Sequence, residues 1–213
     1  MIGKIHKLKK TLQGDMYNIF NLIELLFFRL KAKYFYKMFF GCIGLKSAIY
    51  KPILISNPGK IFIGNFVTIR NGARFEVILK DVHSTPKLSI GNNVNIEQNV
   101  HIVCGSSVRI GNNVSITGGV AIVDVIHPYK DVNDEQKIGS RIQCDGNFVD
   151  IGDNVFIGFG SIIMPNVKIG KNSIIGAHSV VNVDVPEFSV AVGNPARIVK
   201  KYCFDRKEWE KTL

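Results

Sequence analysis

The chain has 213 residues, of which 46% are hydrophobic, and it carries 27 Lys and Arg against 17 Asp and Glu. This composition supplies enough apolar side chains for a substantial core and excludes a disordered chain. Four cysteines, Cys42, Cys104, Cys144 and Cys203, form neither a Cys-x-x-Cys pair nor a cluster with zinc-ligand spacing. We therefore expect reduced thiols, a cytoplasmic protein and no metal site.

The positive charge is concentrated at the N-terminus. Residues 1–51 contain ten Lys and Arg but two Asp and Glu, which leaves 17 against 15 for residues 52–213. Apolar residues recur at helical intervals from Met16 to Leu30, so an amphipathic helix is predicted, too short and too polar to cross a bilayer. No cleavable signal peptide is expected, because the opening basic residues precede no apolar run that ends at a small-residue cleavage site.

Two functions remain open for segment 1–51. Its helix is either a cap on the end of the following domain or an interfacial helix whose basic residues meet anionic lipid headgroups. The pairs Phe27-Phe28 and Phe39-Phe40 leave apolar rings in several directions, whereas a cap needs one apolar face. This pattern favours peripheral contact with the inner face of the cytoplasmic membrane. Nucleic acid is not an expected partner, because no recognised nucleic-acid-binding fold accompanies the basic residues.

A six-residue repeat dominates the rest of the chain. Ile or Val occupies every sixth position in three runs, 90–102, 110–122 and 151–181, and Ile-Gly pairs at residues 63, 90, 110, 151 and 169 each open a unit. One hexapeptide cannot bury a core, so stacked 18-residue coils must bury the first and fifth positions, with Gly, Asn and Asp at the corners. A parallel β-helix over 52–190 is predicted. An α/β sheet is disfavoured, because no helical pattern lies between 88 and 186.

Two segments interrupt the repeat and are predicted to be loops extruded from the β-helix, near 76–87 and 128–147. The second loop directly follows His127, which occupies the outward-facing sixth position of its unit. A neutral imidazole at this position can accept a proton at physiological pH. Asp124, three residues earlier, is a candidate to orient the ring. The last segment, 191–213, is predicted to be a tail with a short helix.

Three parts of this sequence resemble the hexapeptide-repeat acetyltransferases, particularly the sugar and xenobiotic O-acetyltransferases. They are the run Ile126-His127-Pro128-Tyr129, the repeats from Val149 to Val181, and the turn Gly193-Asn-Pro-Ala-Arg197. The resemblance covers about residues 60–201. It implies a left-handed β-helix and a homotrimer with active sites in the clefts between subunits.

The resemblance also implies a mechanism. His127 takes the proton of a sugar hydroxyl, which then attacks the thioester of acetyl-CoA, and a backbone N–H near Gly158-Phe159 stabilises the oxyanion. The positions that match the family's acetyl-CoA contacts are Gly158, Phe159, Ser161, Ala177, Arg197 and Lys200. The candidates for contact with the acceptor are Asn99, His101, Tyr129 and Asp131.

The chain departs from the family pattern at three positions. Phe156 stands where Trp is usual and His178 where Gly is usual, and Val183 occupies a position where relatives often carry Lys. One phosphate contact is therefore expected to be missing. The imidazole of His178 lies near the expected cofactor path, and its role stays open.

Other functions remain open. A non-catalytic scaffold at a membrane fits the basic arm, and an amino-sugar N-acetyltransferase fits the repeat. A zinc carbonic anhydrase would need three converging histidines, but the histidines lack the short His-x-x-x-x-His spacing of those enzymes. For an O-acetyltransferase, the acceptor is a nucleotide sugar, a lipid-linked sugar or a surface-polysaccharide precursor.

Overall fold

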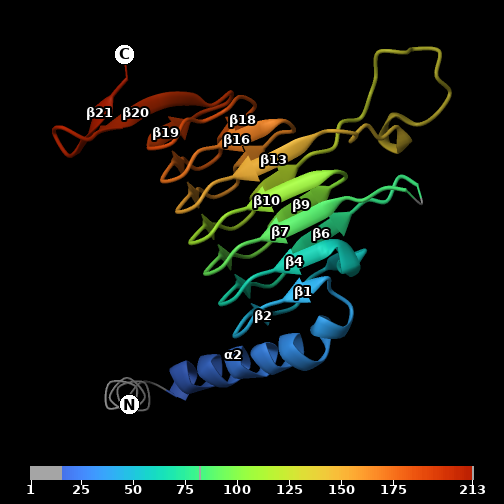
Figure 1. The fold of residues 1–213 in the computed structure, drawn as a ribbon, viewed down its shortest axis with the longest axis vertical. Helices are drawn as coiled ribbons and strands as arrows, with labels where there is room; N and C mark the ends of the chain where they lie inside the picture. Colours follow the sequence, from blue (N-terminus) through green and yellow to red (C-terminus); the bar gives the residue numbers. More distant parts are fainter. Residues whose placement is uncertain (1–15, 82, 213) are drawn as a thin grey trace.

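The computed structural model describes residues 16–81 and 83–212. The described chain begins with helix α2 (Met16–Tyr34) and the 3-10 helix η1 (Tyr36–Met38), continues as a stack of coils, and ends in a hairpin (Figure 1). Residues 1–15 of the predicted basic segment lie outside the described part. No helix among the described residues is long and apolar enough to span a bilayer.

The coils form a three-sided parallel β-helix. Sheet A holds β1 (Cys42–Ile43), β4 (Ile61–Ile63), β7 (Lys87–Ile90), β10 (Ser107–Ile110), β13 (Phe148–Ile151) and β16 (Val167–Ile169). Sheet B holds β2 (Ala48–Ile49), β5 (Thr68–Ile69), β8 (Asn95–Ile96), β11 (Ser115–Ile116), β14 (Phe156–Ile157), β17 (Ile174–Ile175), β19 (Ser189–Val192), β20 (Arg197–Cys203) and β21 (Glu208–Lys211). Sheet C holds β3 (Leu54–Ser56), β6 (Arg74–Val77), β9 (His101–Cys104), β12 (Ala121–Val123), β15 (Ile162–Ile163) and β18 (Val180–Val181). Short 3-10 helices, η2 (Pro58–Lys60) and η3 (Ile138–Ser140), precede β4 and β13.

The six-residue repeat sets the core as predicted. All the repeating Ile and Val positions are buried, and they stack in register between coils; for example, Ile96 pairs with Ile116, which pairs with Ile157. The fifth positions of the uninterrupted units are buried too, either as Val or, at Ser161, Ser173 and Ser179, as hydrogen-bonded serine, whereas Ser106 and Ile126, where the chain leaves sheet C, are more exposed. The continuous interior therefore comes from stacking one short pattern, as a solenoid requires.

The Gly-Asn-Asn motif builds the corner between sheets A and B. The backbone N–H of Asn92 donates to Oδ1 of Asn112 at 2.9 Å, and that of Asn112 donates to Oδ1 of Asp153 at 2.7 Å. The second asparagine, such as Asn113, takes the left-handed conformation with φ 55°. The glycine is required by crowding, because a Cβ at Gly91 would lie 2.5 Å from the carbonyl oxygen of Gly111.

Both ends of the β-helix differ from the expected boundaries. The first coil begins at β1, ten residues before the expected start at 52, since Ile43, which opens an Ile-Gly pair, and Ile49, six residues later, already occupy inward positions. The predicted C-terminal helix is wrong. Residues 197–211 form the hairpin β20–β21. Strand β20 pairs antiparallel with β19 and so covers the edge that β19 would leave open in sheet B.

The two predicted loops are present, and both leave the β-helix between sheets C and A (Figure 1). The first spans residues 78–86, because Glu76 and Val77 still belong to β6. The second spans residues 124–147 and includes η3. An ion pair of 2.6 Å between Lys80 and Asp145 joins the two loops.

Candidate active site

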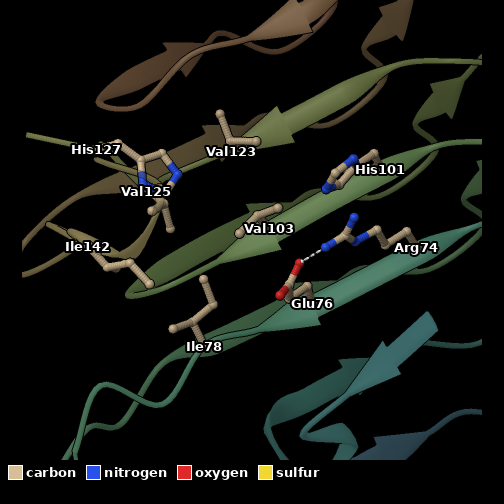
Figure 2. A pocket seen from close by; sticks show the side chains of 10 residues that line it. Arg74, Glu76, Ile78, His101, Val103, Val123, Val125, His127 and Ile142 are labelled. Carbon is tan, nitrogen blue, oxygen red and sulfur yellow. Dashed lines mark hydrogen bonds and ion pairs between the residues drawn. The ribbon is translucent and has the colours of Figure 1, made fainter. Parts of the chain in front are cut away.

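A cavity of about 440 Å³ lies on the outer face of sheet C, where the second loop folds back over the strands (Figure 2). It is apolar in the middle and polar at both ends. Its lining residues are Arg74, Glu76, Ile78, His101, Val103, Val123, Val125, His127, Gly139 and Ile142.

His127 lies at one end of this cavity and its ring is held by one hydrogen bond. Its Nδ1 is 2.9 Å from the backbone carbonyl oxygen of Arg141. A carbonyl oxygen only accepts, so Nδ1 donates its proton, and in the neutral ring the lone pair then lies on Nε2. The imidazole is thus fixed in the tautomer whose Nε2 can take a proton from a ligand.

Arg141 organises the loop around His127, and sequence reasoning missed it. Its guanidinium donates to the carbonyl oxygens of Asp131 and Gln136, at 3.1 and 2.7 Å, and its Nε is 3.0 Å from Asp134 Oδ2. The side chain of Arg141 therefore holds the loop together, and its backbone carbonyl orients the ring of His127. The only sequence signal was that Arg141 is the one arginine in a predicted loop that contains several acidic residues.

We expect Arg141→Ala to lower kcat by roughly 10- to 100-fold, the scale set by about 1 Å of misplacement of a reacting group. The loop would loosen and His127 would lose its fixed orientation, whereas the donor KM should change little. Steady-state kinetics test this, with Lys137→Ala as a control on the same loop. An unchanged kcat in Arg141→Ala would show that the loop holds His127 without this side chain.

Asp124 does not orient His127, contrary to the prediction. Its buried carboxylate accepts the backbone N–H groups of Gly105, Ser106 and Ser107 at 2.6, 2.8 and 2.7 Å. These groups form the tight turn between β9 and β10, one coil below the second loop. The third position of the unit therefore turns this side chain away from the ring and toward the neighbouring turn.

The other end of the cavity holds Arg74, Glu76 and His101. Arg74 and Glu76 form an ion pair, yet the Arg74 Nε and the His101 Nε2 are buried without a hydrogen-bond partner among the described residues. Burial, reinforced by the nearby Arg74 guanidinium, lowers the pKa of His101, so this ring is neutral at physiological pH. Two unpartnered polar atoms in one cavity are the kind of groups that a polar ligand satisfies.

Of the acceptor candidates, only His101 lines the cavity. Asn99 takes a left-handed conformation, φ 57°, and its side chain lies against Gly72 at the corner between sheets B and C. Tyr129 is exposed on the second loop, and Asp131 accepts an N–H bond from Asn133 within the loop. Arg74 and Glu76, which the sequence analysis did not single out, line the cavity next to His101.

We expect His101→Ala to raise the acceptor KM by roughly tenfold, the cost of losing about one buried hydrogen-bonding partner. The donor KM and the melting temperature should change little, since the ring is half-buried and makes no hydrogen bond within the described chain. Initial rates at varied acceptor concentration measure this. An equal loss in His101→Ala and in Arg109→Ala, on the outer face of sheet A, would show that His101 has no special part in acceptor binding.

The candidate cofactor residues stack along the corner between sheets B and C. The His178 N–H donates to the Phe159 carbonyl at 2.8 Å, and the two rings make an edge contact with centroids 5.5 Å apart. One coil further on, the Val180 N–H donates to the carbonyl of Gly193, in the turn that leads to Arg197. Ala177, Arg197 and Lys200 are exposed on or beyond this corner.

Two of these candidates have structural duties. Ser161 is fully buried and its Oγ donates to the Gly176 carbonyl at 2.9 Å, so its side chain is unavailable to a cofactor. Gly158 is buried, and its N–H already donates to the Ile175 carbonyl. The Phe159 N–H has no hydrogen bond within the described chain, so of this pair Phe159 retains a free donor.

The departures from the family pattern lie near the same corner. His178 is exposed with φ 55°, a conformation that favours glycine. Phe156 and Val183 are exposed. The imidazole of His178, whose role the sequence left open, thus packs against the Phe159 ring.

The two halves of the predicted site lie on opposite edges of sheet C. Gly160 sits directly above Gly118 at the B–C corner, through an N–H bond of 3.0 Å, whereas His127 lies past the other end of β12. From Gly119 to His127 there are eight residues, up to roughly 26 Å of extended chain. No lining residue of the His127 cavity comes from the candidate cofactor corner.

The described histidines, cysteines and acids show no metal cluster, since no three of them converge. The four cysteines are free, and burial raises the pKa of Cys104 to about 12. That thiol stays protonated and packs as an apolar side chain.

Comparison with known proteins identifies the family. The model of the bacterial transferase hexapeptide repeat matches residues 148–182. A lipopolysaccharide biosynthesis O-acetyl transferase of Escherichia coli, WbbJ, is 32% identical over 164 residues, which are 75% of this chain and 81% of that protein. The chain is a hexapeptide-repeat acetyltransferase.

Other relatives of this acetyltransferase agree. The galactoside O-acetyltransferase of Escherichia coli is 37% identical over 78% of this chain and 66% of its own length. The crystal structure of AntD, an N-acyltransferase from Bacillus cereus in complex with dTDP and 3-hydroxybutyryl-CoA, has a TM-score of 0.66 and 25% identity and covers 78% of this chain and 85% of that chain. A hexapeptide-repeat acetyltransferase from Vibrio cholerae has a TM-score of 0.56 and 25% identity, covering 81% and 80% of the two chains. The predicted family, enzyme class and left-handed β-helix are confirmed.

Proposed function

We propose that this acetyltransferase moves the acetyl group of acetyl-CoA to a hydroxyl group of a sugar, with His127 as the general base. The observation that carries the proposal is the hydrogen bond from His127 Nδ1 to the Arg141 carbonyl, which leaves Nε2 basic at the end of a 440 Å³ cavity. A hydroxyl is a weak nucleophile until a base takes its proton as the new bond forms.

The transfer balances with these groups. Nε2 of His127 takes the hydroxyl proton while the sugar oxygen bonds to the thioester carbonyl carbon, and the resulting oxyanion accepts a hydrogen bond from a backbone N–H. The tetrahedral intermediate then breaks its C–S bond, and the imidazolium returns the proton to the departing CoA thiolate. The free N–H of Phe159 is the candidate oxyanion donor.

The donor site proposed here lies along the B–C corner. Phe159 and Ala177 would meet the pantetheine arm, and Arg197 and Lys200 would pair with the nucleotide phosphates as cations. The solved neighbour AntD holds a CoA thioester, which supports a CoA donor. Because His127 lies across sheet C from this corner, we propose a homotrimer in which His127 of one subunit meets the donor corner of the next.

The acceptor proposed here is a sugar whose polar groups reach Arg74, Glu76 and His101. The Val103, Val123 and Val125 side chains lie between that polar cluster and His127 (Figure 2), so the acceptor must span the apolar wall to touch both. A nucleotide sugar, a lipid-linked sugar or a surface-polysaccharide precursor has this length. The name of WbbJ supports such a substrate.

Transfer to an amino group is the second candidate. It is favoured by the structural likeness to AntD, which is an N-acyltransferase. The same Nε2 lone pair would serve an ammonium acceptor by taking its proton.

Release of free CoA from acetyl-CoA tests both candidates. We would measure it with a panel of sugars, nucleotide sugars and their amino-sugar analogues. Release that depends on a hydroxylated acceptor supports the O-acetyltransferase, and release only with amino sugars assigns N-acetylation. If acetyl-CoA neither binds nor turns over with any acceptor, the chain is a scaffold on this fold. We place the reaction in the cytoplasm, where the free thiols of this chain are stable.

A further inference from the structure

Helix α2 has two apolar faces, and the cap on the β-helix uses one of them. Phe28 and Ala32 are buried against the first coil, where Phe28 stacks on Tyr50 at 4.5 Å between ring centroids. A second set of apolar side chains follows the spacing i, i+4, i+7, i+11, i+14, i+18, and each is 55–68% exposed: Met16, Phe20, Ile23, Phe27, Leu30 and Tyr34. A cap needs no such second face.

A basic cavity adjoins this exposed face. It has a volume of about 270 Å³ and lies between the last turns of α2, η1 and the first coil. Leu30, Ile43 and Leu45 supply its apolar walls, and its cations are Arg29, Lys33, Lys37 and Lys46. No acidic residue lines it.

The four cations have no acidic partner. Among the described ion pairs none involves Arg29, Lys33, Lys37 or Lys46, and the Arg29 Nε is buried without a hydrogen bond. Glu24 is the only acid between residues 16 and 51, against six Lys and Arg. The positive field at this end of the molecule is therefore uncompensated, which favours an anionic ligand.

We propose that α2 and this cavity dock the enzyme on a membrane that carries anionic phospholipids. The exposed stripe would enter the boundary between headgroups and acyl chains, while the cavity receives a lipid phosphate on its four cations. An apolar stripe flanked by cations matches a lipid surface better than a protein surface, since protein interfaces are depleted of lysine. α2 lies below the first coil, and the second loop, which bounds the His127 cavity, projects from the stack far from α2 (Figure 1), so docking leaves that cavity uncovered.

Vesicle co-sedimentation of the full-length protein tests this proposal. We expect binding to phosphatidylcholine vesicles that contain phosphatidylglycerol, and little binding to phosphatidylcholine alone. The triple variant Lys33→Gln, Lys37→Gln, Lys46→Gln should bind at least tenfold more weakly, because each basic residue near an anionic membrane adds separately to the attraction. The double variant Phe20→Ser, Phe27→Ser should also lose binding, because it removes two exposed side chains that enter the bilayer.

A charge-matched control separates a docking site from general basicity. Lys87→Gln, Lys130→Gln, Lys207→Gln removes three charges from exposed positions elsewhere, so vesicle binding should stay near the wild-type level. Equal losses in the two triple variants, or no binding of the wild type to anionic vesicles, would overturn the proposal. A change of oligomeric state in Phe20→Ser, Phe27→Ser by light scattering would instead assign the stripe to a second copy of the chain. Thermal melting of each variant shows that it remains folded.

Discussion

His127→Ala should lower the rate of acetyl transfer by roughly 10²–10⁴, the usual contribution of a general base. The imidazole is exposed on one side and hydrogen-bonded only to the Arg141 carbonyl, so its removal leaves the buried core untouched. The loss should appear in kcat, because the sugar hydroxyl still binds but keeps its proton. CoA release under saturating acetyl-CoA and acceptor measures it.

Two controls sharpen this prediction. Acetyl-CoA affinity, measured by calorimetry, should stay within about twofold, because the proposed contacts to the pantetheine arm and phosphates come from Phe159, Ala177, Arg197 and Lys200 and not from His127. His127→Gln keeps a polar side chain of similar reach without a base and should be as inactive as His127→Ala. A variant that retains more than about a tenth of the wild-type kcat would exclude general-base catalysis by this ring.

Two inactive variants should restore activity when they share a trimer. The first is His127→Ala, and the second is Arg197→Glu, Lys200→Glu, which reverses two exposed charges on the donor corner. In a cyclic trimer each site takes His127 from one subunit and the donor corner from the next, so random mixing leaves about one site in four intact. Tandem purification through two affinity tags after co-expression selects the mixed trimers, each of which has one intact site of three, and should therefore give roughly a third of the wild-type CoA release.

The same experiment distinguishes a site within one chain. If His127 and its own donor corner worked together, every chain in the mixture would carry a defect and activity would stay at the level of the single variants. Each variant alone must be inactive and trimeric by light scattering for the comparison to hold. A monomer at all concentrations would exclude the shared site.

The repeat made the β-helix core readable from the sequence because each buried position carries the same chemistry at the same spacing. Ile96, Ile116 and Ile157 stack in one column, and the corners can be predicted because they carry asparagine, which tolerates positive φ. The first coil was not predicted although Ile43 opens an Ile-Gly pair and Ile49 follows six residues later, because both lie among the basic and aromatic residues that were assigned to the N-terminal segment. The C-terminal hairpin depends on an unpaired edge of sheet B, which exists only after the coils have stacked.

The candidate site was partly readable. His127 stood out by its place beside a long interruption, but the partner of its ring, the Arg141 carbonyl, depends on how that loop folds back. Asp124 and Ser161 show the opposite outcome. Their residue types suited a role in the site, but the coil geometry directs both side chains into hydrogen bonds that stabilise the β-helix. The division of the site across sheet C also follows from the path of each coil and is invisible in a linear motif.

Both extruded loops leave at the C–A corner, whereas the donor candidates stack at the B–C corner. Evolution can therefore lengthen, shorten or exchange the loops without disturbing the stack, because the tight turn between them is secured independently by Asp124. Under the proposed function, acceptor choice and donor binding would then be able to change separately on one scaffold. Transplanting residues 128–140 from a relative with a different acceptor is a route to new specificity that keeps the same activated acyl group.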